Sequence, residues 1–177
     1  LDAWATSNDR LALLLGQPGV GKTTLLHEWA ARRLAADRLP LPLPIRLPTS
    51  AHVDLQALIL HRAGRPDTPD ERAALALLLA NDRLVPCFDE LDGVPEPGRR
   101  AVLVQALRDL AVDYRILVAA RPYHASAGGG LDVLRGRTAG MRTIHLEQFT
   151  AEQVAALVAR VHAELGDTRD VLSRIAG

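Results

Sequence analysis

The residues best suited to chemistry form one glycine-rich segment, Gly16-Gln17-Pro18-Gly19-Val20-Gly21-Lys22-Thr23. It fits the pattern G-x-x-x-x-G-K-[ST], known as Walker A. Glycines allow the backbone to turn tightly, so that N–H groups and the start of a following helix can surround phosphate oxygens. We therefore predict a nucleotide-binding segment from Gly16 to Thr24, in which Lys22 reaches the β- and γ-phosphates and the Thr23 hydroxyl is a ligand of Mg²⁺.

The use of basic residues singles out the same segment. Of the 21 basic residues, 20 are arginines, and the only lysine is Lys22. A lysine presents a compact point charge, whereas the planar guanidinium of arginine has a different shape and different hydrogen-bonding geometry. The retention of lysine at this one position agrees with the phosphate-binding prediction.

A second candidate segment places acids at the end of an apolar run. Residues 84–88 are Leu-Val-Pro-Cys-Phe, and Asp89 and Glu90 follow directly. In P-loop NTPases an acid at such a strand end holds a Mg²⁺-bound water, and a neighbouring acid polarises the attacking water. We assign the first role to Asp89. For the second role, Glu90 is the first choice and Asp92 the alternative.

A third apolar run, residues 115–120, ends directly before Arg121. An arginine at the carboxyl end of a strand next to the phosphate loop could contact the γ-phosphate and so report its presence. We predict this role for Arg121, which completes a set of three catalytic candidates with Glu90 and Asp92.

Elements that could hold these residues alternate along the chain. Apolar runs predict buried strands at 11–15, 84–88 and 115–120, and a last strand at 142–146. Four prolines between residues 40 and 48 exclude a helix and a central strand, which leaves an extended connector or a short strand over 45–47. Helical spacing and capping signals, at Thr68 and Thr150 above all, predict helices at 22–37, 55–63, 69–81, 98–112 and 151–165. Alternation of this kind predicts an α/β fold of three layers, with a mostly parallel five-stranded sheet flanked by helices.

Composition excludes several other classes of protein. The 177 residues are 48% apolar and carry no net charge at pH 7, so we expect neither intrinsic disorder nor an electrostatic surface for nucleic acid or membrane. The longest apolar runs fall well short of the ~20 residues of a membrane span. The six histidines lack metal-ligand spacing. The single cysteine, Cys87, lies in an apolar run, which favours a core position and a reducing compartment such as the cytoplasm.

The motifs in this order resemble the NACHT branch of the STAND NTPases over residues 10–165 or so. The resemblance is carried by residues 14–26 around the phosphate loop, Pro44-Ile45-Arg46-Leu47, Phe88-Asp89-Glu90-Leu91-Asp92-Gly93-Val94-Pro95, Ala120-Arg121-Pro122 and Leu146-Glu147-Gln148-Phe149-Thr150. It implies a nucleotide-controlled switch in which ADP holds a closed monomer and ATP favours an open form that self-associates. It also implies ATP and ADP, with Mg²⁺, as the ligands. We expect residues 1–166 to be the NTPase domain and residues 167–177 to begin a following helical segment of a longer protein.

The acidic segment departs from the pattern of this family. The usual order is Asp-Gly-x-Asp-Glu, whereas residues 89–93 read Asp-Glu-Leu-Asp-Gly, so that glycine and glutamate have changed places. Gly93 supplies no counterpart to the family's last glutamate, and Glu90 is the residue that could substitute for it. The leading interpretation is a slow ATPase that acts as a switch. The alternative is a high-turnover ATPase of the AAA+ kind, which the Asp89-Glu90 pair favours.

Overall fold

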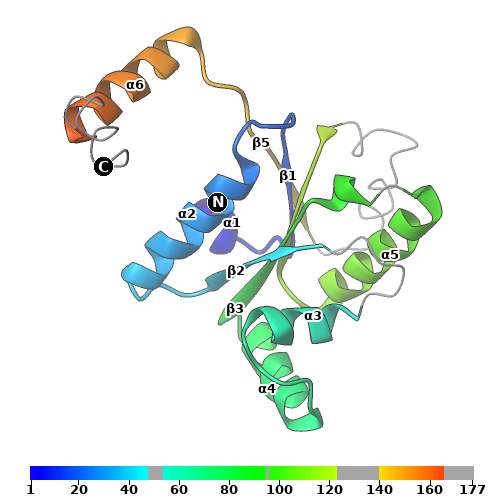
Figure 1. Ribbon diagram of the computed structural model, residues 1–177. Coiled ribbons are helices and arrows are strands. Elements are labelled where there is room, and N and C mark those ends of the chain that lie inside the picture. Colours follow the sequence, from blue (N-terminus) through cyan, green and yellow to red (C-terminus); the bar gives the residue numbers. More distant parts are fainter. Residues whose placement is uncertain (48–53, 95, 123–139, 166–177) are drawn as a thin grey trace, which may run out of the picture. The chain divides into compact units, whose positions relative to one another are not determined.

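The computed structural model describes residues 1–47, 54–94, 96–122 and 140–165. Its centre is one parallel sheet of five strands in the order β2-β3-β4-β1-β5 (Figure 1). The strands are β1 (Leu11–Leu15), β2 (Leu41–Arg46), β3 (Leu84–Asp89), β4 (Ile116–Ala120) and β5 (Met141–His145). The predicted α/β fold with a five-stranded parallel sheet is therefore confirmed.

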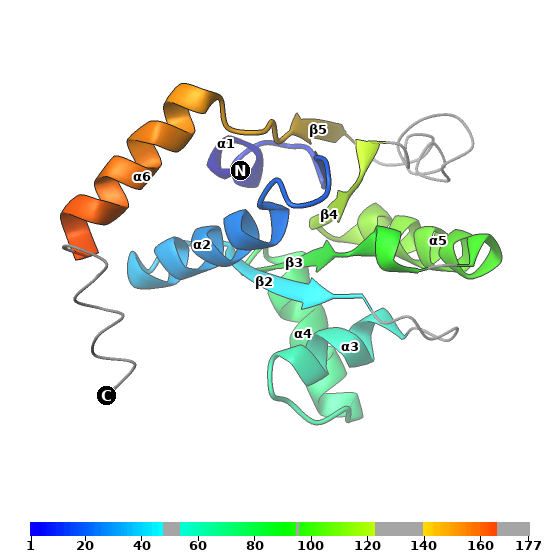
Figure 2. The ribbon, with the colours of Figure 1, turned by 45° about the horizontal axis from the view of Figure 1, so that its top comes forward.

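Helices within residues 1–113 cover both faces of the sheet, as Figure 2 shows. The helices are α1 (Asp2–Ala5), α2 (Lys22–Ala35), α3 (Leu55–Arg62), α4 (Pro69–Ala80), α5 (Pro97–Asp113) and α6 (Ala151–Leu165), with a 3₁₀ turn η1 (Leu91–Gly93) after β3. One core joins the sheet to α3, α4 and α5, and the other joins it to α1 and α2. Strand β1 contributes side chains to both cores. Leu11, Leu13 and Leu15 face the first core, while Ala12 and Leu14 face the second.

Strand β2 resolves the alternative left open by the prolines. It is a strand of six residues at the edge of the sheet, longer than the predicted 45–47, and contains Pro42 and Pro44. An edge strand tolerates proline because the missing N–H does not interrupt a ladder on its free side. Its last residue, Arg46, is in register with Asp89 at the end of β3.

The capping signals are confirmed with one difference. Thr150 and Gln153 exchange hydrogen bonds, each backbone N–H donating to the other's side-chain oxygen at 2.9 and 3.2 Å. Thr68 accepts from the N–H of Glu71 at 3.3 Å, but the Glu71 carboxylate pairs with Arg65 instead of completing the box.

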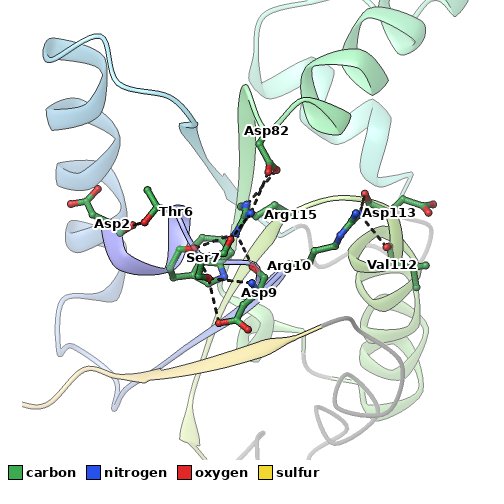
Figure 3. Close-up of polar contacts among 10 residues, drawn as sticks. Asp2, Thr6, Ser7, Asp9, Arg10, Asp82, Val112, Asp113 and Arg115 are labelled. Atoms are coloured by element: carbon green, nitrogen blue, oxygen red, sulfur yellow. Dashed lines mark hydrogen bonds and ion pairs between the residues drawn. The ribbon is translucent and has the colours of Figure 1, made fainter.

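The amino end of the sheet is closed by a short segment that the sequence patterns did not predict. Helix α1 precedes β1, and Trp4 is buried beside Trp29 with ring centroids 6.3 Å apart. Arg115, which is directly before β4, donates to the carbonyls of Trp4, Ser7 and Asp9 and pairs with Asp82 at 3.2 Å (Figure 3). These contacts hold residues 4–9 against the amino end of the sheet.

The chain divides into two compact units, Leu1–Leu146 and Glu147–Gly177. Within the second unit, α6 is amphipathic and exposes Val154, Leu157 and Val158. The predicted segment 167–177 lies outside the described residues. In the part of the chain that the structure describes, no helix has both the length and the apolarity to cross a membrane.

Candidate functional site

The glycine-rich segment joins β1 to α2, as predicted. Gly19 has φ 76° and Gly21 has φ 97°, both in the left-handed region where glycine avoids the cost of a side chain. Gly16 is required by space instead, because a Cβ there would lie 2.7 Å from Val20 Cγ1 and 3.0 Å from the carbonyl oxygen of Leu146. The loop thus has its tight shape from local backbone geometry and one close approach.

Lys22 is the first residue of α2, and its side chain folds back over the loop. The ammonium group Nζ donates to the carbonyl oxygens of Gly16 at 2.7 Å and Gln17 at 3.1 Å. Its charge therefore lies at the loop, where a phosphate could replace the carbonyls as hydrogen-bond acceptor.

Thr23 and Asp89 meet although 66 residues separate them in sequence. The Thr23 hydroxyl donates to Asp89 Oδ2 at 2.5 Å, and Asp89 Oδ1 accepts the N–H of Glu90 at 2.8 Å. Asp89 is only 6% exposed. A hydroxyl and a carboxylate oxygen are hard donors of the kind that Mg²⁺ takes together with phosphate oxygens and water, so these residues fit the cation.

Glu90 has an unusual backbone conformation, with φ 63° and ψ 34°. This is the left-handed region, which costs a residue with a side chain roughly 1–2 kcal/mol. The pattern that the segment resembles has glycine at this position, and glycine would adopt the left-handed conformation without this cost. The carboxylate of Glu90 pairs with Arg46.

The other two catalytic candidates follow neighbouring strands. Arg121 comes directly after β4 and lines the same cavity as the phosphate loop. Asp92 is in the middle of η1, and its side chain lies outside the described ones.

One cavity of about 440 Å³ unites most of the predicted residues. Its walls are formed by Pro18, Gly19, Gly21, Lys22, Thr23, Thr24, Asp89, Glu90, Gly93 and Arg121. Gly16, Gln17 and Val20 shape the loop, by accepting from Lys22 or by filling the space beside Gly16. The cavity therefore brings together the lysine, the hydroxyl and the carboxylates that the sequence predicted for a nucleotide site.

Sequence reasoning missed a second cavity of about 410 Å³ beside the first. It shares Thr23, Asp89 and Glu90 with the first, and is further lined by residues of α2, β2 and α3 that include His27, Arg46, His61 and Arg62. A usable signal existed for Arg46, since it ends an apolar segment in the same way that Arg121 does.

Two further observations concern other kinds of chemistry. Cys87 is buried in the core, as predicted, and burial raises the pKa of its thiol. Among the residues that the structure describes, no three histidine, cysteine or acidic side chains group together as they would around a metal ion.

The strand, glycine loop, lysine-led helix and acid-ended strand define the chain as a P-loop NTPase domain, a nucleotide-binding module. The family model of the NACHT domain matches residues 10–164, and the chain belongs to this family. No curated protein matches the chain at a significant level.

Two solved structures resemble the chain. Drosophila ORC, in a structure bound to DNA, superposes with a TM-score of 0.55 at 12% identity, over 90% of this chain and 43% of that one. C. elegans PCH-2 gives a TM-score of 0.47 at 17% identity, over 94% of this chain and 43% of that one. The chain therefore spans less than half the length of either protein chain, and the likeness to ORC concerns the fold.

Proposed function

We propose that this chain is the nucleotide-switch module of a STAND-type regulator, which binds Mg-ATP and Mg-ADP and hydrolyses ATP slowly. The observation that carries the proposal is that Lys22, Thr23 and Asp89 line one cavity in a chain of the NACHT family. We take residues 1–166 as this module, since the family match continues to residue 164. The proposed setting is the cytoplasm, where the free thiol of Cys87 stays reduced.

Each residue has a proposed role. Lys22 and the backbone N–H groups of Gly19 to Thr24 bind the phosphates, while Thr23 and Asp89 would hold Mg²⁺. When bound, the cation would neutralise charge on the β- and γ-phosphates. Glu90 orients the attacking water, with Asp92 as the alternative, and Arg121 contacts the γ-phosphate.

The output of the module is a change of state. In this proposal ADP favours a closed monomer and ATP favours an open form that self-associates, which requires each nucleotide to bind the two states with different affinity. Slow hydrolysis then limits how long the open form lasts. The exchange of glycine and glutamate supports a low rate of hydrolysis. Glu90 has a left-handed backbone conformation, and Gly93 has no side chain that could act as the family's last glutamate.

A high-turnover ATPase is the second candidate. It is favoured by one observation, the carboxylate of Glu90 directly after Asp89 at the wall of the cavity. Phosphate release by the purified chain separates the two, since a switch turns over slowly and a motor turns over many times per second.

The decisive experiment for the site is calorimetric titration of the nucleotide-stripped chain with Mg-ATP and Mg-ADP. We expect micromolar binding that Lys22→Ala weakens on the order of 100-fold, with ADP bound more tightly than ATP. As matched control, Arg83→Ala removes a cation outside the site and should leave both titrations unchanged. Absence of binding by the unaltered chain would contradict the proposal.

A further inference from the structure

Glu90 and Gly93 are related in space as well as in sequence. If Gly93 carried a Cβ, this atom would lie 3.8 Å from the Cβ of Glu90 and 4.0 Å from its carboxylate oxygen Oε2. The Glu90 carboxylate therefore reaches the place from which a side chain at position 93 would start. Glu90 thus brings its carboxylate to the wall of the cavity from the other end of the turn η1.

In this position the Glu90 carboxylate has considerable conformational freedom. The Glu90 side chain is 39% exposed and has three rotatable bonds, whereas an effective general base must be held within hydrogen-bond reach of its proton. The backbone of Glu90 is fixed by the hydrogen bond from its N–H to Asp89 Oδ1. Its carboxylate needs a further contact to be fixed.

Arg46 supplies that contact. Its Nε donates to Glu90 Oε2, and its backbone is aligned with Asp89 by the β2–β3 register. The Arg46 side chain is 79% exposed, and exposed ion pairs contribute only about 0–1 kcal/mol to stability. The ion pair therefore contributes little to the stability of the fold. Its main effect is to determine the position of the Glu90 carboxylate.

The two cavities show from which side Arg46 acts. Glu90 lines both, while Arg46 belongs to the lining of the cavity between α2, β2 and α3. Arg46 is not among the described residues that line the phosphate-loop cavity. Arg46 can thus hold Glu90 from outside the phosphate-loop cavity.

We propose that Arg46 is a positioning residue for hydrolysis, which fixes the carboxylate of the transposed Glu90 so that it can orient water. This rests on the proposed role of Glu90. In the reaction, the water oxygen bonds to the γ-phosphorus while the bond to the β,γ-bridging oxygen breaks, giving ADP and phosphate. The water proton passes to the Glu90 carboxylate and then to solvent. Arg46 takes no part in these bond changes.

The test is a set of variants assayed by single-turnover hydrolysis of ATP, with ATP affinity measured separately. We expect Arg46→Ala to lower the hydrolysis rate about 10-fold, with ATP affinity and Tm unchanged, since misplacing a catalytic group costs rate and not binding. Arg46→Lys should recover part of the rate. In the presence of Glu90→Gln, the additional change Arg46→Ala should have no further effect. The matched control is Arg62→Ala, because Arg62 lines the same cavity but donates to the carbonyl of Pro44.

A swapped variant gives an independent readout. Glu90→Gly with Gly93→Glu restores the order usual in the family, relieves the left-handed conformation at position 90, and puts the carboxylate on position 93. In this background we expect Arg46→Ala to change the rate less than about twofold, since the carboxylate no longer depends on the pair.

Each outcome has a distinct meaning. If Glu90→Gln slows hydrolysis but Arg46→Ala leaves the rate unchanged or raises it, the positioning role is wrong and the role of Glu90 stands. An equal loss on Arg46→Ala in the original and swapped backgrounds also overturns the positioning role. If Glu90→Gln itself leaves the rate unchanged while ATP still binds, the proposed function of Glu90 fails first.

Discussion

The two ends of the central sheet use basic side chains in different ways. At the amino end, the Arg115 side chain is 9% exposed, donates to three backbone carbonyls and stacks over the Trp4 ring with 5.7 Å between Cζ and the ring centroid. At the carboxyl end, the Arg46 side chain is 79% exposed and has one carboxylate partner, while Lys22 contacts two loop carbonyls beside an open cavity.

This difference separates a structural charge from a functional one. A buried guanidinium must have its donors satisfied by fixed acceptors, and at the amino end the chain supplies them from residues 4–9. At the carboxyl end, the basic side chains lie beside a cavity. A ligand there can replace the protein oxygens as their hydrogen-bond acceptor. Variants at the two ends should therefore change different quantities.

The largest effect is expected at the amino end. Arg115→Met should lower the free energy of unfolding by about 3–5 kcal/mol, because it removes the charged donor of Asp82 and of the part-buried carbonyls of Ser7 and Asp9. Denaturation in urea, followed by circular dichroism, measures this, and nucleotide affinity of the folded fraction should not change. Arg142→Met is the matched control: the Arg142 side chain, which pairs with Asp9, is 43% exposed, so the loss should be below about 1 kcal/mol. Similar losses for both variants would remove the distinction.

The opposite pattern is expected at the carboxyl end. Lys22→Ala should weaken Mg-ATP binding on the order of 100-fold, which corresponds to about 2.7 kcal/mol, because a charged donor to phosphate is lost. The free energy of unfolding should change by less than about 0.5 kcal/mol, since Lys22 contacts only loop carbonyls. A large loss of stability with intact binding would show that this lysine is structural.

A third variant tests how far the shape of the loop depends on packing. Gly16→Ala should destabilise the chain by about 1–3 kcal/mol, because the new Cβ would overlap Val20 Cγ1. Gly98→Ala is the control: in α5, no described atom lies within 4 Å of an added Cβ, and alanine should stabilise the helix by up to about 1 kcal/mol. Thermal unfolding of the two variants should shift Tm in opposite directions, and a downward shift for both would contradict the explanation.

The smallest effect concerns α3, which lines the cavity of Arg46. Asp54 caps α3, and the N–H of Ala57, followed by the Arg72 guanidinium, lowers the pKa of the Asp54 carboxyl. Asp54→Ala should cost about 1 kcal/mol at pH 7.

The pH dependence of this cost has a definite sign. A carboxyl whose pKa is lowered by folding stabilises the fold above its ordinary pKa and loses that contribution as pH falls through the folded value. The difference between Asp54→Ala and the unaltered chain should therefore shrink in acid. Thr68→Ala removes an uncharged cap of the same kind from α4, and its cost should stay constant with pH. Equal pH dependence for both caps would contradict the charge-based explanation.

The sequence determined the local elements that need only short-range information. The glycine loop, the helix starts at Thr68 and Thr150, and the buried strand β1 all follow from residue types within a few positions, because φ requirements, capping hydrogen bonds and apolar runs are local. The pattern also predicted that Asp89 and Arg121 would end strands at the same edge of the sheet.

Only the tertiary structure decided which of these residues meet. Thr23 and Asp89 are 66 residues apart, and Arg46 and Glu90 are 44 apart; both contacts depend on the strand order β2-β3-β4-β1-β5. The binding of residues 4–9 by Arg115 spans more than 100 residues. Periodicity in a sequence indicates which face of an element is buried but not which element covers it, so these pairings, and the orientation of Glu90 with them, come from the sheet as a whole.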